Sequence, residues 1–207
     1  MPYLRLGVIT TAKRLYARVM MQGLALTLPR VDLVSSYLEL LEEVEASDGQ
    51  AHAARPEPAE TPEHFVDRLR DWENDHGDDP KRVPQTTYWP TIDGRVVGHI
   101  GLRHRLNDDL AEYGGHIGYT VRPSLRGRGI AKEMLRQVLE TELARTIGRL
   151  LLTCAPDNVA SNRTIVANGG ELERTIFVER IGRATNLYWI DRGTPRHVPR
   201  VSARRAE

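Results

Sequence analysis

The feature that most constrains the fold is a loop rich in glycine and arginine at residues 122–129. The strand-like run His116-Ile-Gly-Tyr-Thr-Val121 leads into Arg122-Pro-Ser-Leu-Arg-Gly-Arg-Gly, and an amphipathic helical pattern follows. Glycines let the backbone approach a ligand closely, and N–H groups at a helix start point at the ligand with the helix dipole behind them. The order strand, loop, helix therefore predicts a phosphate-binding site in a protein that contains both strands and helices.

Two widespread phosphate-binding motifs fit this loop poorly. A Walker A loop needs Ser or Thr after its lysine, whereas Glu133 follows Lys132 and the glycine spacing is wrong. A dinucleotide fingerprint needs Gly or Ala three residues after its second glycine, and Lys132 stands there. No acidic residue ends a following strand at the usual distance either, so a dinucleotide site is also disfavoured.

The segment from Gly118 to Ala131 resembles the signature of the GNAT superfamily of acetyl-CoA-dependent N-acetyltransferases. That signature consists of Arg or Gln, two residues, Gly, one residue, and Gly or Ala, matched here by Arg126, Gly129 and Ala131. The expected order of elements extends the resemblance over residues 24–191. The resemblance implies an α/β (α+β) fold, with a central mixed, largely antiparallel sheet of about seven strands. That sheet would contain a splayed parallel pair and be flanked by about four helices.

Hydrophobic spacing and turn residues place the expected elements. Apolar residues every three or four positions predict a helix from Leu33 to the turn at Asp48-Gly49. Thr61 before a proline predicts the start of a second helix that runs to about Trp72. Asp93-Gly94 predicts a tight hairpin that pairs residues 86–89 with 96–100. The remaining expectations are one helix over 130–147 capped by Gly148, a helix over 158–168, and strands at 24–28, 149–154, 172–179 and 184–190.

At 207 residues, the chain has room for one domain, expected at 24–191. We interpret residues 1–23 as a basic extension, disordered or part of an over-extended start, and residues 192–207 as a basic disordered tail. The longest apolar run is far shorter than the ~20 residues that span a bilayer. The single cysteine, Cys154, cannot form an internal disulfide or a thiolate metal site. These features predict a cytoplasmic protein without a metal or a membrane anchor.

The resemblance also implies a set of cofactor-binding residues. Backbone groups of Tyr119 and Val121 would pair with the pantetheine arm of acetyl-CoA, and Asn158 would contact that arm from the neighbouring strand end. Alternatively, Asn158 is a helix N-cap, a role compatible with cofactor contact. The arginines of the loop could instead form only a solvated basic surface. The N–H groups that would hold the pyrophosphate are those of Arg126, Gly127, Arg128, Gly129, Ile130 and Ala131.

By resemblance, the acetyl group would move directly to an amine within a ternary complex, with the Val121 N–H serving the oxyanion. We nominate His116 and Glu112 as general base, because they lie on or just before the strand that approaches the thioester. Ile165 stands where many members carry a tyrosine as general acid. Tyr188 or another group would replace that tyrosine, the thiolate would leave unaided, or the protein would be a poor enzyme. Cys154 lies in an apolar strand without an adjacent histidine and is discounted as a nucleophile.

The acceptor has no recognisable code in the sequence. Residues 32–79 carry 15 acidic residues and three arginines, although the whole chain has a formal net charge of +1. If this acidic region borders the site, it favours a cationic primary amine, such as a polyamine, an aminoglycoside-like molecule or a peptide N-terminus. The alternative function is a non-catalytic acyl-CoA-binding module or sensor. Nucleic acid is disfavoured because no aromatic residues interleave the tail arginines, and the final strand could pair across a homodimer.

Overall fold

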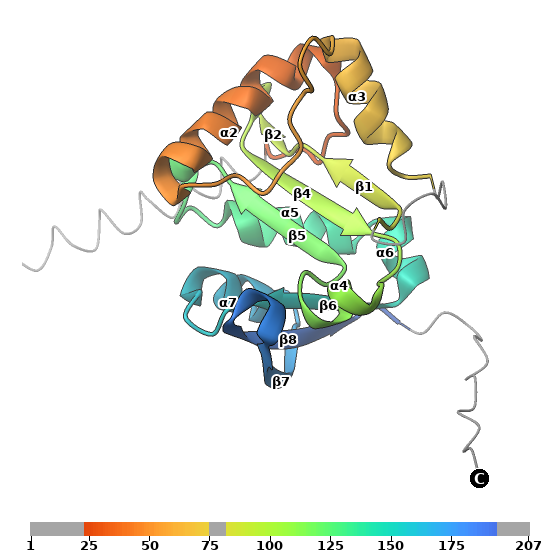
Figure 1. The fold of residues 1–207 in the computed structure, drawn as a ribbon, viewed down its shortest axis with the longest axis vertical. Coiled ribbons are helices and arrows are strands. Elements are labelled where there is room, and N and C mark those ends of the chain that lie inside the picture. The colour runs from red at the N-terminus through yellow and green to blue at the C-terminus, as the bar shows by residue number, and fades with distance from the viewer. Residues whose placement is uncertain (1–22, 75–81, 194–207) are drawn as a thin grey trace, which may run out of the picture.

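The computed structural model describes residues 23–74 and 82–193. The predictions for residues 1–23 and 192–207 therefore lie almost wholly outside the described residues. Figure 1 shows two helices above a three-stranded sheet and a second three-stranded sheet below it. Within the described ranges, no helix is long and apolar enough to cross a membrane, and no cluster of three or more potential metal ligands is found.

The strands form three antiparallel sheets instead of the expected single sheet of about seven strands. In the described part of the chain no ladder joins β5 to β6, so the expected parallel pair is not confirmed. The sheets have the orders β1-β4-β5, β2-β3 and β6-β8-β7. Their strands are β1 (Gln85–Tyr88), β2 (Thr91–Ile92), β3 (Arg95–Val96), β4 (Gly98–Arg103), β5 (Ile117–Val121), β6 (Arg149–Cys154), β7 (Glu171–Val178) and β8 (Arg183–Asp191).

The hairpin at Asp93-Gly94 is confirmed, since both residues adopt positive φ, 50° and 75°. The expected pairing of residues 86–89 with 96–100 is confirmed in part: β1 pairs with β4, with Tyr88 opposite Ile100, and the ladder continues to Arg103. Pro90 interrupts the first arm, since it has no N–H to donate to a ladder. The strand expected at residues 24–28 is wrong: it is reduced to a single bridge between Ala25 and Thr91.

Local capping decides where the helices begin and end. Thr61 caps α3 as predicted, accepting the N–H of His64 at 3.3 Å. The single helix expected over 130–147 is two helices, because the side chain of Thr141 accepts the N–H of Ala144 and starts a new one. Gly148 ends it with a φ of 79°. The helices are α2 (Val34–Asp48), α3 (Pro62–Asp71), α4 (Asp108–Glu112), α5 (Ile130–Leu139), α6 (Glu142–Ile147) and α7 (Val159–Val166), with 3-10 turns at Val31–Leu33, Pro123–Leu125 and Glu179–Ile181.

Two apolar cores lie on opposite faces of the β1-β4-β5 sheet. One contains Met134 and Leu135 of α5 with Ile100 of β4. The other joins α2 and α3 around Trp89, whose ring stacks on Tyr37 at 4.2 Å between centroids. Because β5 is the last strand of this sheet, one of its edges is open. The final strand, β8, is central in its own sheet and β7 is the edge, so the expectation of an exposed final strand is wrong.

Candidate active site

The phosphate loop has the backbone that its glycines predict. Gly127 and Gly129 adopt φ values of 74° and 86°, which other residues rarely accept. Gly129 is the N-cap of α5, and no side chain caps this helix. The first N–H groups of an α-helix have no partner within the helix, so those of α5 are available to an anion. The N–H of Arg126 is not, because it donates to the carbonyl of Pro123 at 3.2 Å.

The side chains of the loop arginines bind protein groups. The Arg126 guanidinium donates to both carboxylate oxygens of Asp48, at 2.8 and 2.6 Å, and to the carbonyl of Val121 at 3.2 Å. Arg128 donates to the carbonyl of Ser124 at 3.3 Å. Arg126 therefore ties the loop to the end of α2 through an ion pair at the surface.

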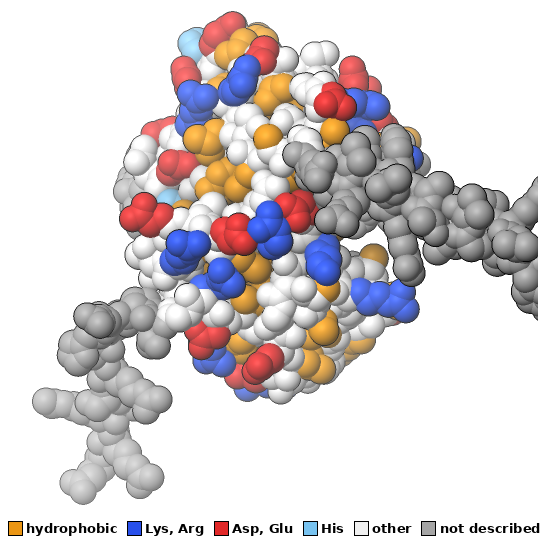
Figure 2. Space-filling model, turned by 180° about the vertical axis from the view of Figure 1, so that it is seen from behind, with side chains coloured by type: hydrophobic (Ala, Val, Ile, Leu, Met, Phe, Trp, Pro, Cys, Tyr) orange, Lys and Arg blue, Asp and Glu red, His pale blue; other side chains and the backbone are white. Residues whose placement is uncertain are grey.

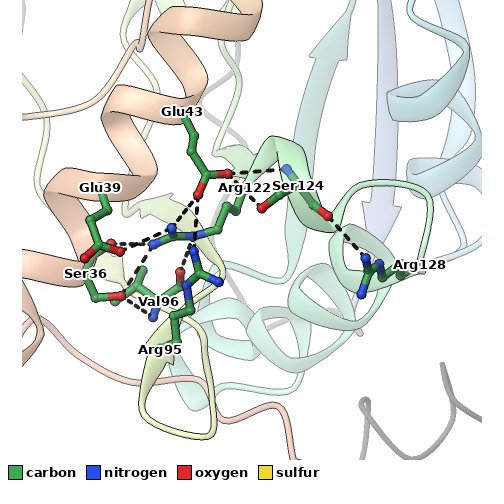
Figure 3. Close-up of polar contacts among 8 residues, drawn as sticks. All are labelled: Ser36, Glu39, Glu43, Arg95, Val96, Arg122, Ser124 and Arg128. Carbon is green, nitrogen blue, oxygen red and sulfur yellow. Dashed lines mark hydrogen bonds and ion pairs between the residues drawn. The ribbon is translucent and has the colours of Figure 1, made fainter.

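A second arginine, missed by the sequence analysis, anchors the start of the loop (Figure 3). The side chain of Arg122 is fully buried and donates to Glu43 at 2.6 Å, to the Ser36 carbonyl at 2.6 Å and to the Val96 carbonyl at 2.9 Å. Glu43 also accepts the hydroxyl of Ser124 at 2.8 Å. Helix α2 thus holds the loop at both ends.

The open edge of β5 presents alternate backbone groups. Arg103 N–H donates to His116 O, and Arg122 N–H donates to Val97 O. Both pairs continue the ladder between β4 and β5, in which bonded and non-bonded pairs alternate. The backbone groups of Tyr119 and Val121 therefore point away from β4, towards the open edge. This matches the two residues expected to pair with the pantetheine arm.

A cavity of about 770 Å³ lies beside this edge. The hydroxyl of Tyr119 reaches across it to Ser161 of α7, at 2.8 Å between oxygens. Its wall includes His99, Gly101 and Arg103 of β4; Gly118, Tyr119 and Thr120 of β5; Leu152, Thr153 and Cys154 of β6; and Asn158, Ser161 and Ile165 at α7. The phosphate loop lies outside this lining, so the cavity is separate from the pyrophosphate site.

None of the three expected catalytic side chains lines the cavity. His116 is buried, and its Nδ1 accepts the N–H of Leu151 at 2.9 Å. Glu112 is exposed at the end of the short helix α4. The hydroxyl of Tyr188 is buried and donates to Asn162 Oδ1 at 2.6 Å. The structure therefore gives His116 and Tyr188 structural partners and leaves Glu112 at the surface.

The remaining predicted residues do line it. Asn158 caps α7, accepting the Ser161 N–H at 3.0 Å, and also faces the cavity, so its two interpretations coexist. Ile165 gives an apolar wall where a tyrosine is common. The thiol of Cys154 donates to Asn162 at 3.3 Å, and burial raises its pKa to about 11. At neutral pH Cys154 is therefore a protonated thiol, a poor nucleophile.

His99 is a functional candidate that the sequence analysis missed. It lies on the same face of β4 as Gly101 and Arg103, and it lines the cavity opposite Thr120 of β5. Burial, helped by the charge of Arg103, lowers the pKa of His99 to about 4. Its imidazole is therefore neutral at pH 7, and it is a weaker base than an ordinary histidine. Period-two alternation along residues 98–103 is the signal that could have found it.

Several acidic residues of 32–79 pair with arginines. Besides Asp48 and Glu43, Glu45 binds Arg55 at 2.6 Å and Glu60 binds Arg68 at 2.7 Å. Figure 2 likewise shows acidic and basic side chains intermixed on the opposite face of the molecule. Of the described residues, no Asp or Glu lines the cavity. The argument from acidic helices to a cationic acceptor therefore does not extend to the cavity.

The buried histidines predict a pH dependence of stability. Burial first, and Arg103 second, lowers the pKa of both His116 and His99 to about 4, whereas an unfolded histidine titrates near 6.5. As pH falls from 6.5 to 4 the unfolded chain binds more protons, so the free energy of unfolding decreases across this window. At about 1.4 kcal/mol per pKa unit, the loss is on the order of 3 kcal/mol for the buried His116 and smaller for the partly exposed His99.

Urea unfolding at several pH values checks this expectation. His116→Gln should flatten the pH dependence between 6.5 and 4, while His64→Gln on the exposed surface of α3 should not. An identical slope in His116→Gln and the unaltered protein would show that His116 is not held neutral.

Comparison with known proteins places the chain in a family. The model of the acetyltransferase (GNAT) family matches residues 48–167, and no curated protein matches the chain. The solved structure of the microcin C7 self-immunity acetyltransferase MccE with acetyl-CoA and AMP has 17% identity and a TM-score of 0.56, covering 82% of this chain and 92% of that one. Aminoglycoside acetyltransferase AAC(6')-Ib with coenzyme A has 17% identity and a TM-score of 0.57, covering 82% and 95%.

A third similar structure is the Salmonella typhimurium acetyltransferase that modifies the N-terminal serine of ribosomal protein L7/L12. It has 21% identity and a TM-score of 0.58, with 82% of this chain and 95% of that one covered. At these identities the structures establish a shared fold. The family model spans more than half of the sequence and includes the phosphate loop. The chain therefore belongs to the GNAT family of acetyltransferases.

Proposed function

We propose that this chain, over residues 24–191, is an N-acetyltransferase that transfers the acetyl group of acetyl-CoA to a primary amine within a ternary complex. The observation that carries the proposal is the open edge of β5, which runs directly into the uncapped start of α5. Backbone groups of Tyr119 and Val121 would pair with the pantetheine arm. The N–H groups from Gly127 to Ala131 would hold the pyrophosphate, and Asn158 would contact the arm from α7.

The transfer needs three things from the protein. The amine must be neutral, the thioester oxyanion must be stabilised, and the departing thiolate must receive a proton. In our proposal the amine nitrogen attacks the thioester carbonyl, the C–N bond forms, the C–S bond breaks, and the amine loses one proton. The Val121 N–H, at the open edge, would donate to the oxyanion.

His99 takes the role of general base in this proposal, in place of His116. Its neutral imidazole lines the cavity, whereas Nδ1 of His116 is already bound to Leu151. The Tyr119 hydroxyl is the proposed proton source for the thiolate. It meets α7 at Ser161, one turn before Ile165, the position where a tyrosine is common in the family. Burial raises the pKa of Tyr119 to about 12, so it carries its proton at neutral pH.

Replacing His99 with glutamine should lower kcat about 100-fold, within the range of about 10²–10⁴ for general acid–base catalysis. The KM for acetyl-CoA should not change, because His99 lies outside the phosphate loop. Steady-state kinetics with the best acceptor measures both constants. His64→Gln, an exposed histidine on α3, is the matched control and should retain full activity. A kcat for His99→Gln within threefold of the unaltered enzyme would remove His99 from the mechanism.

A thermal-shift titration with acetyl-CoA, CoA and NAD tests the function itself. A ligand at 100 times its Kd adds about 2.7 kcal/mol of stability when it binds only the folded state. Acetyl-CoA and CoA should stabilise the protein and NAD should not. Stabilisation without acetylation of any amine would instead support a non-catalytic acyl-CoA-binding module, and no shift with either CoA species would refute the proposal.

A further inference from the structure

Arg103 places a cation in the wall of the cavity, on the side away from the phosphate loop. It pairs with His116 in the β4–β5 register, at the opposite end of β5 from Val121. Its Nη1 donates to the carbonyls of Gly114 and Gly115, at 3.1 and 2.9 Å. These carbonyls hold the guanidinium in place but leave its other N–H groups without a protein partner among the residues described.

Among the residues that the structure describes, no carboxylate pairs with this guanidinium. Nor does any Asp or Glu in that part of the chain contribute to the cavity wall. Burial holds the pKa of Arg103 below its ordinary value, as expected for a cation without a counter-ion. A partly buried arginine remains charged at neutral pH all the same. The lining also includes Arg183, so the cavity wall is positively charged.

The guanidinium of Arg103 lies beside Gly118 of β5. A Cβ at Gly118 would lie 3.9 Å from both Nη1 and Nη2 of Arg103, so the guanidinium lies against the bare backbone of β5. The next residue is Tyr119, whose backbone is open towards the cavity. A group bound by Arg103 would therefore be close to the point where the pantetheine arm is proposed to lie.

Resting on the proposed acetyltransferase function, we propose that the acceptor is an amine that also carries an oxyanion, and that Arg103 binds this oxyanion. The planar fork of a guanidinium matches a carboxylate or a phosphate through two parallel hydrogen bonds. Arg103 lies beside the strand that approaches the thioester, so the anionic group of the acceptor would be bound in the same cavity as its amine. This replaces the cationic acceptor expected from the acidic composition of residues 32–79.

The test compares acceptors that differ in one charge. Release of free CoA is measured with L-amino acids, the corresponding amino acid amides, O-phosphoethanolamine and spermidine. At least one anionic amine should be acetylated with a kcat/KM about tenfold or more above its uncharged counterpart, the scale of a hydrogen bond between charged groups. In Arg103→Gln this preference should fall to within about twofold, because the KM for the anionic acceptor rises. Arg103→Lys should restore part of the preference.

Arg180→Gln is the matched control, since Arg180 pairs with Asp109 at the surface and does not line the cavity. It should keep the full preference. Any one of four results would overturn the inference. These are equal turnover of acids and amides, a preference for spermidine, an unchanged preference in Arg103→Gln, and no turnover of any anionic amine. If acetyl-CoA still stabilises the protein in these cases, the proposed function is not contradicted. Absence of that shift in the unaltered protein would refute both.

Discussion

Replacing Gly129 with glutamate should abolish acetyl-CoA binding while the domain stays folded. Gly129 precedes the uncapped start of α5 with a φ of 86°. A glutamate side chain there adds bulk and a negative charge where N–H groups are available to a pyrophosphate. The left-handed backbone costs a non-glycine residue roughly 1–2 kcal/mol, less than the usual stability of a domain. Thermal shift should give about 2.7 kcal/mol of stabilisation for the unaltered protein at 100 times Kd, and none for the variant.

Two further variants separate the charge from the backbone strain. Gly129→Ala imposes the same strain without the carboxylate and should keep part of the acetyl-CoA shift. Gly182→Glu places the same side chain at another glycine of positive φ, 64°, where a Cβ would meet no atom within 4 Å. It should bind acetyl-CoA like the unaltered protein. A full acetyl-CoA shift in Gly129→Glu would show that the loop does not hold the cofactor.

Features set by neighbouring residues were predictable from the sequence. The backbone of the phosphate loop depends on Gly127 and Gly129, because positive φ is a local requirement. The same holds for the turn at Asp93-Gly94 and for the cap at Thr61. The open edge at Tyr119 and Val121 could be predicted only from the family resemblance, because the order of strands in a sheet is not set by neighbouring residues.

Other features depend on competition between signals. The apolar spacing of α5 continues through Leu143 and Ile147, so periodicity alone extends the helix to Ile147. The hydroxyl of Thr141 caps a new helix, α6, and so divides the predicted helix in two. Thr141 was therefore the residue that indicated the break. In the same way Pro90 interrupts the first arm of the hairpin, so that β2 pairs with β3 and β1 pairs with β4 as separate ladders.

Which histidine borders the cavity is decided by tertiary structure. His99 and His116 project from the same face of their sheet, since their partners Thr120 and Arg103 share that face. Sequence alternation cannot say which part of that face borders a cavity. Leu151 of the next sheet occupies Nδ1 of His116, whereas His99 lines the open space. The same applies to Arg122, whose carboxylate partner lies 79 residues earlier in the chain.

Replacing Arg122 with methionine should destabilise the protein by about 3 kcal/mol, because removing one partner of a buried ion pair leaves the other poorly compensated. The buried guanidinium donates hydrogen bonds to Glu43 and to the carbonyls of Ser36 and Val96, and each of these acceptors loses its donor in the variant. Glu43 is 31% exposed and keeps a contact with Arg95 at 3.3 Å, which places the expected loss at the lower end of the range for such pairs. Urea unfolding measures this loss of stability. The slope of the free energy of unfolding against urea concentration should be the same in the variant and the unaltered protein.

Arg136→Gln is the matched control for a surface pair. Arg136 binds Glu133 and Glu140 at 2.6 Å each, but its side chain is 47% exposed, so its loss should cost below about 1 kcal/mol. Combining Arg122→Met with Glu43→Gln should cost less than the sum of the two single changes, because the double variant leaves no buried charge without its partner. A loss below 1 kcal/mol in Arg122→Met would contradict this account of the buried pair.

The same substitution should also weaken acetyl-CoA binding, because Glu43, which binds Ser124 of the loop, loses its shortest ion pair when Arg122 is removed. We expect the KM for acetyl-CoA to rise about tenfold with kcat nearly unchanged, since uniform binding is lost and the transfer chemistry is not touched. Kinetics are measured at 20 °C below the melting temperature of the variant, so that unfolding does not contribute. Arg136→Gln should leave KM unchanged. If Arg122→Met lowers stability but not cofactor affinity, α2 supports the fold without positioning the phosphate loop.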